Sequence, residues 1–285
     1  MAFTTLIDTS TLSRHLNDPT FVIVDCRFKL DDEEWGARAY AEAHVPGSVY
    51  ASLDRDLSGP KTGSNGRHPL PEASALIGTF EHLGIGDDTQ VVAYDQDAGM
   101  YASRLWWLLR WMGHVEVAVL DGGFAKWLAE GQPTAAETGS PAARPARGFT
   151  GAPRSDMTAD AVEVARLIHN PEWRLLDARA PERFSGAVDP IDRVPGHIPG
   201  ATNHFFKGNL DAQGTLLPPE QLRERLLDSI AGVRPDRVVS YCGSGVTACH
   251  NLLALEHAGI PGAKLYPGSW SEWSSDPTRP IEPSK

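Results

Sequence analysis

Short apolar runs alternate with longer amphipathic segments along most of the chain. Some of the apolar runs are rich in β-branched and aromatic residues and predict buried parallel strands, at residues 21–24, 91–94 and 238–241. Apolar residues at helical spacing follow a Pro-Pro-Glu start and predict an amphipathic helix, at Leu222, Leu226, Leu227 and Ile230. Strands that alternate with helices indicate an α/β fold, in which a parallel sheet is covered by helices on both faces.

The order of these segments occurs twice. The stretch "LPEASALIGTFEHLGIGDDTQVVAYD" is echoed by "LPPEQLRERLLDSIAGVRPDRVVSYC" at a constant offset, which aligns Asp95 with Cys242. In the same way "AEAHVPGSV" is echoed by "VPGHIPGAT", and "DGGFAKW" by "PGSWSEW". A repeat of this length predicts two homologous domains rather than a solenoid. We place them at residues 1–138 and 157–285, joined by a linker at 139–156 that is rich in Ala, Pro, Gly and Arg.

Composition narrows the class of protein. The formal net charge of −11 over 285 residues argues against nucleic-acid binding, because phosphate contacts need clustered Lys and Arg. No apolar run is long enough to span a bilayer, and the first residues do not read as a signal peptide, so we expect a cytoplasmic protein without membrane association. The cysteines Cys26, Cys242 and Cys249 are too few and too scattered for a disulfide framework. They are either buried structural thiols, or one of them is present for its reactivity.

Cys242 stands directly after the predicted strand "VVSY" and before a helical run. A loop in this place lies above the carboxyl ends of the strands, where open α/β folds bind ligands. We expect Gly243 and Gly245 to adopt positive φ angles, so that successive N–H groups converge on the sulfur. A helix that begins near Val246 or Thr247 adds the positive end of its dipole. These effects favour the thiolate, an activated nucleophile, and the same cradle would hold a persulfide anion.

Other strand–loop–helix motifs do not fit this loop. A nucleophile elbow needs glycine two positions on either side of Ser244, where Cys242 and Val246 stand. A phosphate-binding loop needs a lysine that the loop lacks, and a cysteine-based phosphatase needs an arginine at the position of Ala248. Cys249 has the spacing of neither a CxxC pair nor a zinc site. It either resolves an oxidised Cys242 or is packed in the core.

The first half cannot perform the same thiol chemistry, because it has Asp95 at the position of Cys242. It has instead a longer segment after "HVPGS", which contains Asp54, Asp56, Arg67 and His68. Added loop length is a common location for functional groups, although a solvated surface excursion gives the same pattern.

The duplicated halves, the "GHIPGA" and "HVPGS" signatures and above all "CGSGVTA" resemble the tandem-domain rhodanese sulfurtransferases over nearly the whole chain. Within that family, "CGSGVT" is most similar to the loop of the 3-mercaptopyruvate sulfurtransferases. Relatives that prefer thiosulfate carry basic residues after the cysteine, where this chain has Gly243 and Ser244. A dianionic donor needs cations beside its sulfur, so the difference has a physical basis.

The resemblance implies a set of catalytic residues. Cys242 would attack the sulfur of the donor and carry it as a persulfide, in a site between the two domains. Ser244 would act with His68 and Asp54 on the reacting sulfur and the developing pyruvate enolate, with the carboxylate orienting the histidine.

The resemblance also implies substrate-binding residues. Arg183 in "ERFSG" matches the family arginine that binds the acid group of the donor. Arg193 is the candidate for a second arginine, although strict alignment puts Ile191 at that place. The rest of the predicted binding loop is Gly243, Gly245, Val246 and Thr247. Residues present in both halves are expected to be structural, as is an aromatic residue of the core; these are Arg27 and Arg179, His44 and His197, and Trp270.

We therefore expect an enzyme that moves sulfur from a small anionic donor, 3-mercaptopyruvate, through Cys242 to a thiol or to cyanide. No motif implies a metal or an organic cofactor. By resemblance, the acceptor is thioredoxin or a low-molecular-weight thiol. The alternatives are a thiosulfate sulfurtransferase and a non-catalytic or redox-sensing rhodanese module. A phosphatase or arsenate reductase on this fold is disfavoured by Ala248.

Overall fold

The computed structural model describes residues 2–96, 98–136 and 147–282, which form two compact units. The first unit comprises the described residues of Met1–Gly59, Leu70–Arg154 and Ala212–Thr215. The second comprises those of Pro60–Pro69, Ser155–Asp211 and Leu216–Lys285. The part of the longer segment that carries Arg67 and His68, Pro60–Pro69, thus belongs to the second unit, whereas Asp54 and Asp56 belong to the first. The predicted boundary between residues 138 and 139 lies outside the described residues.

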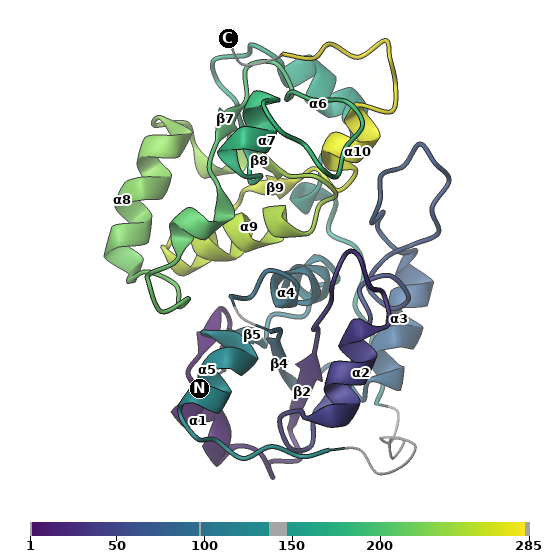
Figure 1. The fold of residues 1–285 in the computed structure, drawn as a ribbon, viewed down its shortest axis with the longest axis vertical. Helices are drawn as coiled ribbons and strands as arrows, with labels where there is room; N and C mark the ends of the chain where they lie inside the picture. The colour runs from purple at the N-terminus through teal and green to yellow at the C-terminus, as the bar shows by residue number, and fades with distance from the viewer. Residues whose placement is uncertain (1, 97, 137–146, 283–285) are drawn as a thin grey trace. The chain divides into compact units, whose positions relative to one another are not determined.

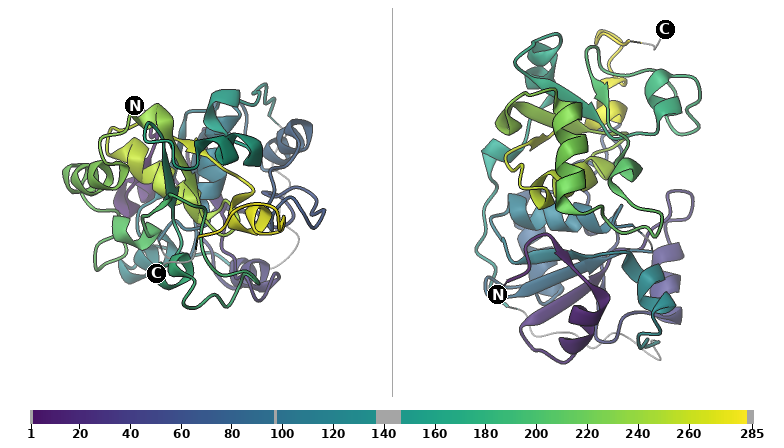
Figure 2. Two further views of the ribbon diagram at one scale, coloured as in Figure 1. Left: turned by 90° about the horizontal axis from the view of Figure 1, so that it is seen from above. Right: turned by 90° about the vertical axis from the view of Figure 1, so that its left-hand side faces the viewer.

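The first unit contains a parallel sheet with the strand order β1-β5-β4-β2-β3 (Figure 1). Its strands are β1 (Leu6–Ile7), β2 (Phe21–Asp25), β3 (Val49–Tyr50), β4 (Gln90–Tyr94) and β5 (Val117–Leu120). Its helices are α1 (Thr9–Arg14), α2 (Trp35–Glu42), α3 (Ala73–His82), α4 (Ala102–Trp111) and α5 (Gly123–Ala129). Every residue of β4 is buried, and successive side chains of a strand point to opposite faces, so both faces of the sheet are covered. On one of them α4 packs along β4 and β5 (Figure 2).

The second unit contains a parallel sheet with the strand order β7-β6-β8-β9. Its strands are β6 (Arg174–Asp177), β7 (Thr202–Asn203), β8 (Val238–Tyr241) and β9 (Lys264–Leu265). Its helices are α6 (Ala161–Leu167), α7 (Pro181–Ser185), α8 (Pro219–Ile230), α9 (Thr247–His257) and α10 (Ser269–Trp273), with 3₁₀ turns η1 (Ser155–Met157), η2 (Phe206–Asn209) and η3 (Pro235–Arg237). All of β8 is buried, so its sheet is also covered on both faces. The predicted α/β class with parallel sheets is confirmed in both units.

The predicted structural pairs of the two halves recur as equivalent contacts. Arg27 and Arg179 each form a fork-like ion pair with the aspartate two residues earlier, with shortest N···O distances of 2.7 Å in both units. The rings of His44 and His197 each bond a backbone carbonyl and stack on a neighbouring aromatic ring. Trp270 lies in the hydrophobic core of the second unit. These side chains are therefore occupied by structural contacts.

The predicted apolar face of α8 is largely confirmed. Leu222, Leu226 and Ile230 are buried as the helical spacing predicted, but Leu227 is 39% exposed, because it lies at the edge of the apolar face.

Among the described residues, none of the helices has the length and apolar character that crossing a membrane requires.

Candidate active site

Cys242 directly follows β8, and its sulfur accepts a hydrogen bond from the N–H of Gly245 at 3.2 Å. Gly245 has φ +77° and turns the chain back toward the sulfur. The sequence predicted that several backbone amides converge on the sulfur. That prediction was wrong, because among the described residues only the N–H of Gly245 is directed at Sγ. Gly243 is also not in the left-handed region, contrary to the prediction. Positive φ is required only once, because a single reversal suffices to aim an amide at the sulfur.

The loop is fixed on both sides by hydrogen bonds. Cys242 donates its N–H to Ser269 Oγ at 3.1 Å and accepts at its carbonyl from Trp270 N–H at 2.9 Å. The thiol of Cys249 donates to the carbonyl of Gly245 at 3.3 Å, and its residue is fully buried. Cys249 therefore packs beneath the loop, which agrees with the core alternative rather than with a resolving thiol. Cys242 is itself buried, with 2% of its surface exposed.

Several N–H groups of this loop have no acceptor. Within the described residues, those of Ser244, Val246 and Thr247 donate no hydrogen bond. Thr247 is the first residue of α9, whose N-terminal amides have no partner inside the helix. The loop from Cys242 to Val246 is buried, and buried N–H groups without an acceptor are costly. An anion bound in this loop would offer these N–H groups an acceptor.

His68 lies against this loop. Its Nδ1 is 2.7 Å from Ser244 Oγ, and both residues are almost fully buried. The segment that carries His68 is held in the second unit by contacts of its neighbours: Arg67 donates its N–H to Ser271 Oγ at 3.0 Å, and a side chain on Gly66 would clash with the backbone of Gly268. The structure thus brings together two of the predicted residues, the imidazole of His68 and the hydroxyl of Ser244. Ser244 is two residues after Cys242 in the chain.

The guanidinium group of Arg183 also lies at the loop, next to Gly243, the residue that follows Cys242. A Cβ built on Gly243 would be 3.1 Å from Arg183 Nη2 and 2.7 Å from Arg67 Nη2. The sequence interpretation named Arg183 but left Arg67 out of the site. Its second candidate, Arg193, is exposed. The sequence signals for Arg67 were its place in the longer segment of the first half and its position beside His68.

Asp54 belongs to the first unit, where it is half-buried in the turn after β3. The neighbouring Asp56 caps this turn, because its carboxylate accepts the N–H of Ser52 at 2.7 Å. The role of Asp54 as the carboxylate that orients His68 remains a prediction.

A family model described as "Rhodanese-like domain" matches the chain twice, over residues 8–130 and 160–276. The chain belongs to the rhodanese family. The two matched stretches confirm the predicted pair of rhodanese-like domains.

Relatives over the full length carry sulfurtransferase names. A Pseudomonas aeruginosa protein named "Probable 3-mercaptopyruvate sulfurtransferase" is 47% identical over 283 residues, which cover 99% of each chain. Rattus norvegicus thiosulfate sulfurtransferase is 33% identical over 90% of this chain and 85% of its own. The solved 3-mercaptopyruvate sulfurtransferase from Leishmania major is 32% identical and superposes with a TM-score of 0.84, over 95% of this chain and 74% of its own. These names support the prediction of a sulfurtransferase. They include both 3-mercaptopyruvate and thiosulfate as donors of the relatives.

The first rhodanese unit shows how this kind of loop treats a negative charge. Asp95, which is equivalent to Cys242, accepts the N–H groups of Gly99, Tyr101 and Ala102 at 2.7–3.0 Å. Its carbonyl accepts from Phe124 N–H at 2.8 Å, as that of Cys242 does from the equivalent Trp270. The loop of the first unit therefore holds a built-in carboxylate at the position where the second has a thiol.

Gly245 gives a direct test of the loop geometry. A Cβ there would lie 2.4 Å from the carbonyl oxygen of Pro267, in addition to the strain of φ +77°. We expect Gly245→Ala to lower the free energy of unfolding by about 3 kcal/mol and to reduce activity, because the amide moves away from the sulfur. Gly232 is the matched control, since it has φ +75° but open space around it, and Gly232→Ala should cost only about 1 kcal/mol. Equal losses in urea unfolding would contradict the predicted clash.

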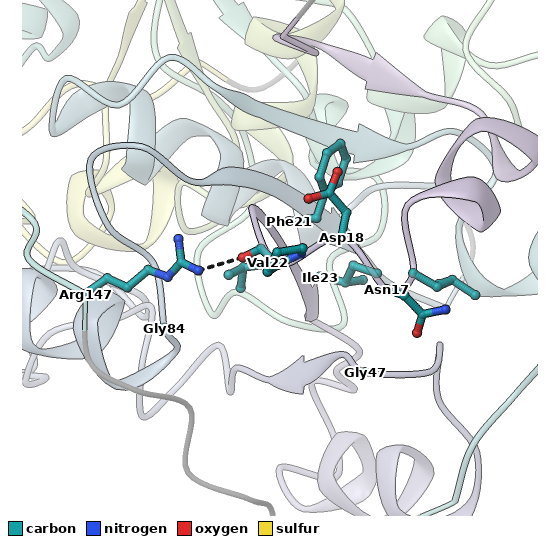
Figure 3. Close-up of a pocket in the computed structure, with 10 residues that line it drawn as sticks. Asn17, Asp18, Phe21, Val22, Ile23, Gly47, Gly84 and Arg147 are labelled. Carbon is teal, nitrogen blue, oxygen red and sulfur yellow. Dashed lines mark hydrogen bonds between the residues drawn. The ribbon is translucent and has the colours of Figure 1, made fainter.

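The rhodanese fold also leaves a cavity of about 310 Å³ in the first unit (Figure 3). It is lined by Phe21, Val22 and Gly84 among others, and Arg147 closes one side by donating to the carbonyl of Pro19 at 2.6 Å. None of the described lining residues is a cysteine or a histidine. Among the described residues, no cluster of His, Cys, Asp and Glu could hold a metal ion.

Proposed function

We propose that the protein is a sulfurtransferase that takes sulfur from 3-mercaptopyruvate onto Cys242 and passes it to a thiol or to cyanide. The observation that carries the proposal is the Cys242 loop itself: Gly245 N–H is bonded to the sulfur, and Ser244 is bonded to His68 at 2.7 Å. A thiol alone would be compatible with a structural cysteine. A thiol beside a hydroxyl–imidazole pair is an arrangement for covalent transfer coupled to proton movement.

The first half-reaction is a displacement at sulfur. The Cys242 thiolate attacks the thiol sulfur of 3-mercaptopyruvate, the carbon–sulfur bond breaks, and its electron pair forms the enolate of pyruvate. The enolate then takes up the proton that the transferred sulfur carried, which leaves pyruvate and a Cys242 persulfide anion. The sum of charges is unchanged, and neither an oxidant nor a cofactor is needed.

His68 and Ser244 are assigned to the proton in this step. A hydroxyl that is hydrogen-bonded to an imidazole can accept a proton from the donor's thiol and return it to the enolate carbon. Arg183 is assigned to the donor's carboxylate, since a guanidinium matches a carboxylate with paired N–H groups. Asp54 and Arg193 keep the predicted roles of orienting carboxylate and candidate second arginine until they are tested.

The loop amides are suited to the intermediate. The N–H groups of Ser244, Val246 and Thr247 have no acceptor within the described residues, and the outer sulfur of a persulfide is a negatively charged acceptor. In the second half-reaction an acceptor thiolate attacks this outer sulfur and releases the Cys242 thiolate. With cyanide the same attack gives thiocyanate. Thioredoxin or a low-molecular-weight thiol is the acceptor that the resemblance suggests, and a cytoplasmic location stays a prediction.

Thiosulfate is the second candidate donor, favoured by the relatives that bear its name. Its transfer releases sulfite and needs no enolate, so it makes less use of His68. A side-by-side comparison of kcat/KM for the two donors distinguishes them, and we expect 3-mercaptopyruvate to be preferred. A clear preference for thiosulfate would reverse the assignment of the donor.

Intact-mass spectrometry tests the proposal directly. After incubation with 3-mercaptopyruvate in the absence of an acceptor, we expect the protein to gain the mass of one sulfur atom. Peptide mapping should place that atom on Cys242, and cyanide should remove it as thiocyanate. A protein that gains no sulfur from either donor would contradict the proposal and favour a redox-sensing module.

A further inference from the structure

Ser269 has a backbone conformation that is unusual for its residue type. It is the first residue of α10, it is fully buried, and its φ of +53° lies in the left-handed region that favours glycine. The other non-glycine residues with positive φ in the described part of the chain are His169 and Ala231, and both are exposed in turns. A residue keeps such strain only where its contacts offset the cost.

The first unit shows that this backbone conformation does not require serine. The equivalent residue is Gly123, which has φ +59°. In each unit the next residue donates its N–H to a carbonyl of the loop, that of Asp95 at 2.8 Å in the first and that of Cys242 at 2.9 Å in the second. Glycine therefore supports the same loop contact without strain, and the serine of the second unit adds to it a side chain with a hydroxyl group.

The hydroxyl of Ser269 is bonded to the residue that carries the reactive thiol. Its Oγ donates to the carbonyl of Tyr266 at 2.9 Å and accepts the N–H of Cys242 at 3.1 Å. The direction of both bonds is fixed, because a hydroxyl has one proton and a carbonyl can only accept it. The oxygen lone pairs are then left for the Cys242 N–H. The side chain that accompanies the strained backbone is therefore engaged with the nucleophile's own amide.

Cys242 is thus held at both of its peptide groups and at its sulfur. Ser269 Oγ holds its N–H, Trp270 N–H holds its carbonyl at 2.9 Å, and Gly245 N–H is bonded to Sγ at 3.2 Å. The first two bonds fix the peptide planes on either side of the Cα atom, and with them the direction of the Cα–Cβ bond. If the plane before Cys242 turns, the sulfur moves relative to the Gly245 donor and to a bound substrate.

We infer that Ser269 is a positioning residue for the nucleophile: its hydroxyl holds the amide of Cys242 so that the sulfur stays on the N–H of Gly245. The inference rests on the proposed function, in which Cys242 attacks the donor. It involves no contact between Ser269 and the donor. A displaced thiol slows attack on any sulfur, so the effect of losing the hydroxyl should be the same for 3-mercaptopyruvate and thiosulfate.

Two substitutions separate the hydroxyl from the backbone strain. Ser269→Gly and Ser269→Ala both remove the hydroxyl, but only glycine also relieves the strain. We expect both variants to lose kcat about 10-fold with either donor, with KM little changed. The midpoint of thermal unfolding should be about 3 °C lower for Ser269→Ala than for Ser269→Gly, because alanine keeps the unfavourable φ. If Ser269→Ala does not fold, Ser269→Gly carries the kinetic test alone.

Alkylation of Cys242 reports on the sulfur without turnover. The rate of its modification by iodoacetamide is followed by peptide mapping over a pH series. We expect the rise of this rate to move to higher pH in Ser269→Gly, because a thiolate that loses the Gly245 donor is less favoured. Ser274→Ala is the matched control. It removes a hydroxyl just after the same helix, which donates to the carbonyl of Trp270 at 2.7 Å, and should change neither kcat nor the alkylation profile.

The outcomes for Ser269→Gly decide the inference. A wild-type kcat would overturn it, since the hydroxyl would then have a structural role only. A loss confined to one donor, or a loss of kcat with an unshifted alkylation profile, would overturn it as well, because neither is the effect of a displaced thiol. If the wild-type protein takes up no sulfur from either donor, the proposed function fails, whereas the alkylation profiles still test whether Ser269 controls the Cys242 thiol.

Discussion

Replacement of Cys242 by serine is expected to abolish sulfur transfer, with turnover falling about a thousandfold or more. The hydroxyl of serine stays protonated in the same loop, and an oxygen cannot carry sulfane sulfur to an acceptor. The amide of Gly245, which bonds the sulfur at 3.2 Å, would instead bond the hydroxyl, so the fold should be retained. Thiocyanate or pyruvate release measures turnover, and intact mass should show no gain of sulfur.

Cys26→Ala is the control for this variant. Burial raises the pKa of the Cys26 thiol well above its ordinary value, and the nearby Asp25 and Asp95 act in the same direction. Cys26 is therefore a neutral, inert thiol, and its loss should leave turnover near that of the wild type. Turnover in Cys242→Ser, with sulfur mapped to Cys26 or Cys249, would contradict the assignment of the nucleophile.

Two kinds of feature could be predicted from the sequence: elements with a characteristic local composition, and residues that the two halves share or do not share. The runs at 21–24, 91–94 and 238–241 coincide with β2, β4 and β8, because buried parallel strands have a composition that few other elements share. The duplication marked Arg27 and Arg179 as structural, and both are engaged in equivalent ion pairs. Comparison of the two halves also singled out Cys242, since only the second half has a thiol there.

Features that depend on contacts between distant segments could not be predicted. The carboxylate of Asp192 joins Arg67 and Arg183 from separate parts of the chain, and no local pattern indicates such a bridge. The same is true of the segment Pro60–Pro69, which lies in the first sequence half and packs in the second unit. The positive φ expected at Gly243 was wrong; a side chain at this position would instead meet the guanidinium groups of Arg67 and Arg183.

The duplicated loop explains how one scaffold can hold either a structural or a reactive group. In the first unit the carboxylate of Asp95 accepts hydrogen bonds from three amides of its own loop. In the second unit a shorter side chain leaves neighbouring amides without acceptors among the described residues. The proposed persulfide would extend Cys242 by one sulfur atom and carry a negative charge, as a carboxylate does. In the proposed mechanism, the persulfide anion of the second unit thus has the same place in its loop as the carboxylate of Asp95 has in the first.

Loss of the imidazole in His68→Ala is expected to reduce kcat/KM for 3-mercaptopyruvate about 100-fold or more, and that for thiosulfate only several-fold. The first donor must lose a thiol proton and form an enolate, whereas the second releases sulfite and needs no proton relay. Ser244→Ala should give the same donor-dependent loss, because its hydroxyl is the group that His68 contacts at 2.7 Å. Parallel kinetics with the two donors provide the measurement.

The double variant decides whether the two residues act as one relay. If the proton passes through both, His68→Ala and Ser244→Ala combined should cost little more than either alone, since breaking a chain twice has the effect of breaking it once. His82→Ala, an exposed histidine of the first unit, should leave both donors unaffected. Equal losses on both donors would mean that His68 only supports the loop, because a misplaced thiol slows every attack on sulfur, whatever the leaving group.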